Sequence, residues 1–275
     1  TVAVSHNASN EANPVEVALS GSGIAPAIAV APEAIGFGSV LVGASGTEGL
    51  TIENTGSAPL EGTVSLSGDT SAFTITDGNG DFSIAPGETQ AVEVTFAPGA
   101  SASFAGTVAI EHNASNASSP VEVSLTGNGI APAIAVTPEA VNFGSVVTGE
   151  SATETLTIEN TGDASLDGAV SLSNGEGVFS LASGSGAFSL SPGETQAVEV
   201  TFAPGETESF TGNVAIEHSA SNASSPVDVG LTGNGTAPAI AVDSEAVDFG
   251  SVTAGESTLQ SLTIENTGSA LLEGT

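Results

Sequence analysis

Three histidines carry the side chains best suited to acid–base or metal chemistry, and they recur at a fixed interval of 106 residues. His6, His112 and His218 each follow a run of alternating apolar residues, and the last is in phase with Val214 and Ile216. Such a histidine can act as a cation ligand or a pH switch, or it can be a strand-end side chain that caps the core. Because one histidine per repeat cannot build a multi-histidine metal site, we expect the structural role.

The acidic run DGNGD is a second candidate site. Asp77, Asn79 and Asp81 alternate with glycine as in part of a calcium-binding loop, but the bidentate glutamate of such a loop is missing. The equivalent positions in the next repeat are Ser183, Ser185 and Ala187. The run is therefore either a weak calcium site or a glycine-rich hairpin turn, and we expect the turn.

Five asparagines lie in N-x-S/T sequences, which are acceptors for glycosylation in a secreted protein. They are Asn7, Asn113, Asn116, Asn222 and Asn234. All but the last precede the closing strand of a repeat, where asparagine and serine are also common for their local hydrogen bonding to the backbone. The sequence leaves both explanations open, and we expect the second.

Catalytic chemistry has little material in this chain. Cysteine, lysine, arginine and tyrosine are all absent. A Ser–His–acid triad would have to use the strand-end histidine, and no serine lies in a nucleophile-elbow sequence. We therefore expect neither an enzyme nor a bound cofactor.

The charge balance argues against several classes of partner. The chain has 32 acidic residues and no lysine or arginine, which gives a formal charge of −32. Such a chain repels phosphate, so we expect no binding to nucleic acid or to anionic membranes. Its longest apolar stretch, residues 24–46, contains Pro26, Pro32 and Glu33 and does not qualify as a membrane span. Dissolved cations remain as partners.

The missing bases, rather than an excess of acids, are the anomaly. A chain without lysine or arginine offers no site to trypsin-like proteases, which suits a protein that works outside the cell or at its surface. Compositional drift in a repetitive sequence explains the same absence.

Internal repeats organise the whole chain. The sequence GSGIAPAIAV begins at Gly21, and close variants begin at Gly127 and Gly233. The motif IENTG begins at Ile52, Ile158 and Ile264. A period of 106 residues is too long for one turn of a solenoid and fits a complete domain.

The repeat frame predicts two complete domains, residues 26–131 and 132–237. Residues 1–25 match the C-terminal strands of a preceding repeat, and residues 238–275 match the N-terminal strands of a following one. Neither end segment supplies the equivalent of residues 64–106, so we expect this chain to be part of a longer array.

The elements that position these residues are short strands. In the second repeat, apolar residues alternate with Thr, Ser or Glu around residues 134–136, 156–160, 198–202 and 227–231. Asn-Thr-Gly and Pro-Gly turns separate such runs, and no stretch has the 3.6-residue apolar period of a helix. Seven to nine strands of this kind predict an all-β fold of tandem Ig-like antiparallel β-sandwich repeats.

The repeat resembles the hydin-like or ASH-type Ig-like domain of bacterial surface proteins of the choice-of-anchor D kind. The resemblance rests on VNFGSVVTGESATETLTIENTG at 141–162, on FSLSPGETQAVEVTFAPG at 188–205 and on GNVAIEHSASNASSPVDVGLTGNG at 212–235. It covers essentially the whole chain and implies an Ig-like sandwich with an architectural role.

Two functions follow as expectations. The array is a structural component of an extracellular or cell-surface fibre or stalk, with self-association through neighbouring repeats, or it is the spacer or binding part of a bacterial adhesin for a glycan or protein. Near-identical repeats favour the fibre, since a binding site is usually confined to a few diverged loops. The segments 68–81 and 174–187 differ between the repeats, and a binding site of the second kind would be sought there.

We predict that trypsin leaves the unfolded chain intact, because its target side chains are absent. Proteases that cut beside Phe, Leu or Glu should fragment the same sample. Gel electrophoresis and mass spectrometry after overnight digestion in urea provide the measurement. Tryptic fragments would contradict the prediction.

Overall fold

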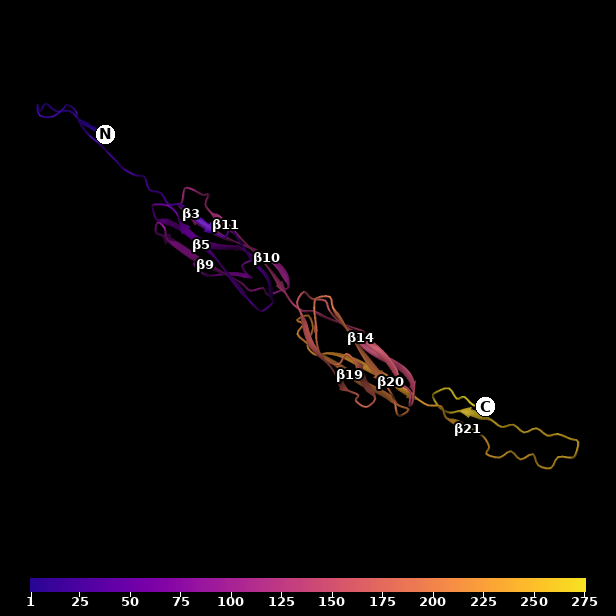
Figure 1. Ribbon diagram of the computed structural model, residues 1–275. Coiled ribbons are helices and arrows are strands. Elements are labelled where there is room, and N and C mark those ends of the chain that lie inside the picture. The colour runs from indigo at the N-terminus through magenta and orange to yellow at the C-terminus, as the bar shows by residue number, and fades with distance from the viewer. The chain divides into compact units, whose positions relative to one another are not determined.

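The protein is built from β-strands alone in a computed structural model that describes residues 1–275 (Figure 1). The chain divides into two compact units, Thr1–Gly129 and Ile130–Thr275. Each unit contains one β-sandwich, so the prediction of an all-β fold with tandem sandwich domains of about 106 residues is confirmed. No helix is present that could cross a membrane.

Nine strands form the first sandwich. They are β3 (Ile28–Ala31), β4 (Ala34–Leu41), β5 (Gly46–Asn54), β6 (Leu60–Gly68), β7 (Phe73–Asp77), β8 (Gly80–Ile84), β9 (Thr89–Phe96), β10 (Ala102–His112) and β11 (Val121–Ile130). One sheet has the order β3-β5-β9-β7, and the other has the order β4-β11-β10-β6-β8. The chain therefore changes sheets repeatedly, which closes a core between them.

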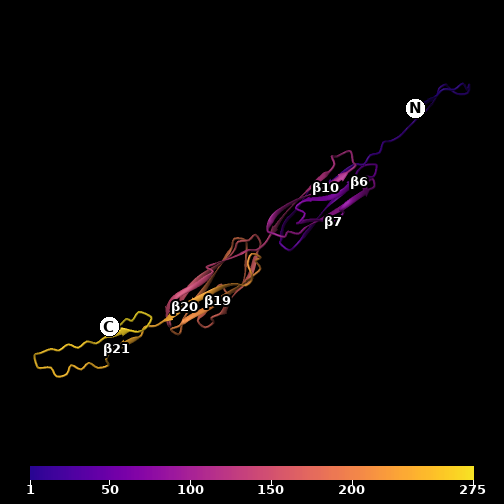
Figure 2. The ribbon, with the colours of Figure 1, turned by 180° about the vertical axis from the view of Figure 1, so that it is seen from behind.

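The second sandwich repeats this plan strand by strand. Its strands are β12 (Ile134–Thr137), β13 (Ala140–Val147), β14 (Ala152–Asn160), β15 (Leu166–Asn174), β16 (Phe179–Ser183), β17 (Gly186–Leu190), β18 (Thr195–Phe202), β19 (Ser209–His218) and β20 (Val227–Thr236). The sheets have the orders β12-β14-β18-β16 and β13-β20-β19-β15-β17. The neighbours β19 and β20 are seen from behind in Figure 2.

The pairing of β13 with β20 departs from the predicted antiparallel arrangement. β13 runs parallel to β20, from Ala140 opposite Gly230 to Val147 opposite Thr236. The chain leaves β12 in one sheet, passes Pro138 and enters β13 at the edge of the other sheet, beside the last strand. Apolar alternation has a period of two in parallel and antiparallel strands alike, so the sequence pattern could not distinguish them.

Each core is centred on a cluster of four phenylalanines. In the second sandwich, Phe202 stacks on Phe179 at a centroid distance of 5.0 Å and also contacts Phe143 and Phe210. Gly233 lies against the Phe202 ring, and a Cβ there would lie 2.6 Å from a ring carbon. The Phe-Gly, Phe-x-Pro and Thr-Gly-Asn-Gly motifs therefore belong to one packing unit, which burial of apolar surface stabilises.

A fully buried asparagine locks the two sheets of each sandwich together. Asn160, at the end of β14, has no exposed surface. Its Nδ2 donates to the carbonyls of Ala164 and Leu190 at 2.8 and 2.9 Å, and its Oδ1 accepts from the Gly162 N–H at 3.0 Å. Leu190 ends β17 of the opposite sheet, so one amide joins both sheets to the turn between them. Asn54 makes the same three bonds in the first sandwich.

Two short hairpins lie outside the sandwich sheets. β1 (Val2–Val4) pairs only with β2 (Val15–Val17), and β21 (Ile240–Val242) pairs only with β22 (Ile264–Asn266). Their registers equal those of β10 with β11 and of β12 with β14, shifted by one repeat. The Thr263 side chain and backbone N–H hold the pKa of Asp243, beside β21, below its usual range. Partial-repeat identities for residues 1–25 and 238–275 stay predictions.

We predict that Asn160→Ala destabilises the second sandwich by about 3 kcal/mol, because two carbonyls and one N–H would be left unsatisfied near the core. Hydrogen exchange followed by mass spectrometry reports the two sandwiches separately, and protection should fall in residues 130–236 alone. The control is Asn234→Ala, which removes an exposed amide bonded to the Ser209 hydroxyl. Equal effects of the two substitutions would contradict the role of the buried Asn160 amide in holding the two sheets together.

Candidate functional site

Each repeat histidine holds the loop that follows it. The Nδ1 atom of His218 accepts a hydrogen bond from the Ala220 N–H at 3.2 Å, and Nε2 lies 3.2 Å from the Ser224 carbonyl. The backbone N–H of His218 also donates to the Ser225 hydroxyl at 2.9 Å. Because Nδ1 accepts, the proton of a neutral ring resides on Nε2, which donates to Ser224. The ring thus spans the loop from its first residues to its last.

The same loop is fastened to the first strand of the sandwich by an asparagine. Asn222 accepts from the Ile134 N–H and donates to the Ile134 carbonyl, both at 2.9 Å. Its amide therefore takes the place that a neighbouring strand would have at Ile134. Asn116 does the same for Ile28 in the first sandwich.

The glycosylation candidates occupy different environments. In Asn116 and Asn222, Oδ1 accepts and Nδ2 donates a hydrogen bond at a strand edge. Oδ1 of Asn113 accepts from the Glu61 N–H at 3.1 Å. Asn234 is exposed in β20, and Asn7 is exposed in the loop after β1. Glycosylation of any of the five stays a prediction from sequence. The geometry gives Asn116 and Asn222 a structural use, since their amides bind backbone.

Carboxylates lie near His112 and His218, but they do not gather around either histidine as metal ligands. A surface hollow of about 470 Å³ is lined by His218, Asp167 and Glu217, among others. A similar hollow of about 420 Å³ surrounds His112. No group of three or more His, Asp or Glu side chains in residues 1–275 is arranged to hold a metal ion. With its ring nitrogens bonded to the loop backbone, the histidine acts here as a brace.

The DGNGD segment connects two sheets and is not a hairpin turn. β7 ends at Asp77 in one sheet, and β8 begins at Gly80 in the other, so the interpretation as a hairpin was wrong. Gly78 and Gly80 have φ angles of 75° and 93°, which glycine adopts without strain. The local pattern resembles a hairpin because a sheet crossing needs the same tight, glycine-dependent turn.

Two of the three calcium candidates make separate hydrogen bonds at this crossing. Oδ1 of Asp77 accepts from the Gly78 N–H at 2.9 Å, and Oδ1 of Asp81 accepts from the Thr63 hydroxyl at 2.7 Å. Asn79 lies between the two glycines. The equivalent crossing in the second sandwich keeps its positive-φ glycines, Gly184 and Gly186, without the acidic residues. The glycines are thus explained by the fold, and calcium binding stays a prediction.

The segments that differ between the repeats, 68–81 and 174–187, include the loop between β6 and β7. In the first sandwich, Asp69 exchanges two hydrogen bonds with Ala105 on β10, one through its carboxylate at 2.9 Å and one through its backbone N–H at 3.0 Å. In the second sandwich, Gly175 stands at the equivalent position and has a φ of 89°. The two repeats therefore form the turn after β6 and β15 with different backbone conformations and hydrogen bonds, and they present different surfaces there.

Sequence reasoning missed the residues with the most specific polar geometry. The sequence pattern places Asn160 at the end of the alternating run 156–160 and predicts no role for its side chain or for that of Asn54. The signal that could have found them is the recurrence of Ile-Glu-Asn-Thr-Gly, with the asparagine in the apolar phase of its strand. A polar residue in that phase is buried, and a buried amide requires partners.

Comparisons with known proteins agree with this architecture. The family described as Cep192 domain 4 matches the chain twice, over residues 25–130 and 131–236. No curated protein matches the sequence.

Several solved structures resemble the chain at low similarity. A protein of unknown function from Porphyromonas gingivalis W83 is 15% identical, with a TM-score of 0.32, over 75% of this chain and 99% of that one. The ASH/PapD-like domain 7 of human CEP192 is 15% identical, with a TM-score of 0.33, over 38% of this chain and 86% of that one. Titin domains I67–I69 are 14% identical, with a TM-score of 0.38, over 78% and 68%.

We predict that His218→Ala loosens the loop at residues 219–225 and lowers the stability of the second sandwich by about 1–2 kcal/mol, because two hydrogen bonds to backbone groups are lost. Hydrogen exchange at the Ala220 amide should rise at least tenfold. His6→Ala is the matched control, since His6 makes equivalent bonds to Ala8 and Ala12 in the first hairpin. Unchanged hydrogen exchange at the Ala220 amide would contradict the role of His218 in holding this loop.

Proposed function

The chain belongs to the Cep192 domain 4 family through both of its sandwiches, and on that premise we propose that it is a structural component of an extracellular or cell-surface fibre or stalk. Tandem Ig-like, ASH-like domains support a repeat-based structural or binding role. The fibre is the more specific form of that role, and it needs no catalytic residue.

The observation that carries this proposal is that three sets of structural hydrogen bonds recur in both repeats. These are the bonds of the buried amides Asn54 and Asn160, the bonds of His112 and His218 to the loops that follow them, and the bonds of Asn116 and Asn222 to the first strands. All three recur at an interval of one repeat. These side chains thus hold the sandwich and its loops in both repeats. A chain whose domains are held by the same bonds is suited to building length by repetition.

Charge and chain length between the domains support the same proposal. β11 ends at Ile130 and β12 begins at Ile134, so very few residues separate the last strand of one domain from the first strand of the next. A formal charge of −32 keeps chains apart at low salt and favours solubility. The absence of trypsin sites suits exposure outside the cell.

Electron microscopy of the protein isolated from its source tests the fibre. We expect a thin single-file filament with an axial repeat of roughly 35–45 Å per domain, from strands of about nine residues plus loops. Salt screens charge within about 10 Å at 0.1 M, so side-by-side bundling should increase with ionic strength. A tube of laterally packed subunits, or isolated globular particles at all salt concentrations, would overturn the fibre.

A second candidate function is the spacer or binding part of an adhesin. The differing segments 68–81 and 174–187 favour it, because binding sites are commonly placed in variable loops on a constant scaffold. A glycan array probed with the chain separates the two. Saturable binding of one glycan class, lost when residues 68–81 are replaced by the sequence of 174–187, would support the adhesin; signals that follow only glycan charge would count against it.

A further inference from the structure

A groove recurs along one side of both sandwiches, where the first strand changes sheets. In the second sandwich it has a volume of about 590 Å³ and is lined by Ile134, Val136, Ala223 and Val227 together with acidic residues. In the first sandwich a groove of about 460 Å³ is lined at the equivalent positions, including Ile28, Val30, Ala117 and Val121. The recurrence shows that the fold itself, and not a variable loop, makes this groove.

The two walls of the groove are strand edges. β12 is the end strand of its sheet and pairs only with β14. On the opposite wall, β13 covers β20 only from Gly230 onward, which leaves Val227–Val229 without a neighbour on that side. Edges of this kind present backbone N–H and C=O groups in the direction in which a further strand would add.

Only part of the β12 edge is capped. Ile134 exchanges both of its outward hydrogen bonds with the side chain of Asn222. Outward-pointing groups alternate along a strand, so Val136 points the same way as Ile134, while Ala135 faces Glu159 on β14. The edge at Val136 is therefore open to an added strand. Asn222 already occupies the neighbouring outward groups of Ile134, so the added strand must end there.

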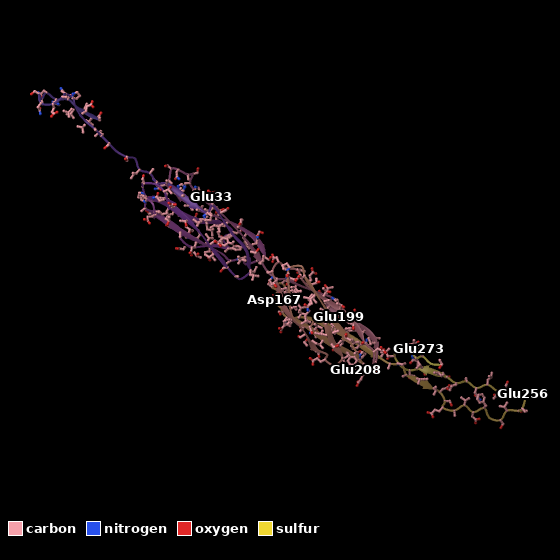
Figure 3. The ribbon with its side chains drawn as sticks, viewed as in Figure 1. Glu33, Asp167, Glu199, Glu208, Glu256 and Glu273 are labelled. Carbon is pink, nitrogen blue, oxygen red and sulfur yellow. The ribbon has the colours of Figure 1, made fainter.

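The floor of the groove is apolar and its rim is acidic. Val136, Ala223 and Val227 are half-buried and pack on the core. Glu139 and Asp228 lie on the rim, and Oδ1 of Asp228 accepts from Nδ2 of Asn213 at 2.8 Å. In the first sandwich the rim residues are Glu33 and Glu122, and Figure 3 shows Glu33 on the outside of that sandwich. None of these carboxylates can find a lysine or arginine partner in the chain itself.

We propose that this groove binds an extended segment of another protein by β-strand addition, and that the segment alternates small apolar side chains with lysine or arginine. The backbone of the guest pairs with the open edge at Val136, its apolar side chains contact the floor, and its cations lie along the acidic rim. Charge complementarity excludes a second copy of this chain as the guest, because it carries no basic residue and a charge of −32. The proposal does not depend on whether the array is a fibre.

A seven-residue peptide of alternating valine and lysine, blocked at both ends, is the probe. It is titrated into the whole chain at 0.15 M salt, where long-range attraction is screened. We expect saturation at two peptides per chain, with NMR amide shifts concentrated at residues 134–137 and 227–229 and at their equivalents one repeat earlier.

Substitutions and altered peptides separate the groove from general charge attraction. Glu139→Gln with Asp228→Asn should weaken binding at the second sandwich about tenfold while the first is unchanged. The control, Glu206→Gln with Glu208→Gln, removes the same charge from exposed residues outside the groove and should have no effect. A peptide N-methylated at alternate residues, which cannot pair with a strand edge, should not bind.

The proposal would be overturned by equal binding of the N-methylated peptide, by equal weakening by the control pair, or by amide shifts spread over all acidic residues. A block peptide of three lysines followed by three valines should also bind at least tenfold more weakly than the alternating one. If it binds equally well, the groove does not read an extended strand.

Discussion

The position of the two sheets of each sandwich depends on one buried asparagine amide. It pairs with backbone groups that apolar side chains would leave without a hydrogen bond. Asn54 and Asn160 are fully buried, yet each side chain uses both Nδ2 hydrogens and Oδ1 on backbone groups. Burial of an amide costs free energy unless every such group is paired, so the position tolerates one geometry only. That geometry fixes the end of β14 against the end of β17 and thereby fixes one sheet against the other.

A chain without lysine or arginine cannot obtain such specificity from carboxylate–guanidinium pairs. Asparagine amides, hydroxyls and the histidine ring make the contacts that carboxylate–guanidinium pairs make in other proteins. The hydrogen bonds of the amides and hydroxyls are insensitive to salt, whereas the carboxylates, which have no lysine or arginine partner in the chain, repel one another and respond strongly to salt. Stability inside each domain and interaction between molecules are therefore governed by different physical terms, which allows ionic strength to change association while the sandwiches stay folded.

Much of this could be predicted from sequence because the relevant signals are local. Alternation placed the strands, glycine and proline placed the turns, and the 106-residue interval gave the tandem organisation. The parallel pairing of β13 with β20, the sheet crossing at Gly78 and the bonding of Asn160 to Leu190 could not be predicted in the same way. The pairing and the Asn160 bond join residues far apart in sequence, and the crossing depends on which other strands β7 and β8 pair with. In each case the local pattern is identical for the alternatives. The same holds for the groove, since Val136 and Val227 share no sequence motif.

The position of a binding surface within a repeat has consequences for the whole array. A site in segments 68–81 or 174–187 changes from one repeat to the next only in their exposed loop residues, because β7 and β16 within these segments supply Phe73 and Phe179 to the cores. A groove formed by β12, β20 and the bonds of Asn222 to Ile134 cannot vary in this way, since the same contacts hold the sandwich together. Every added repeat therefore adds one equivalent groove. A weak guest strand that occurs several times in its own chain would then be held by many grooves at once, with an avidity set by the spacing of the repeats.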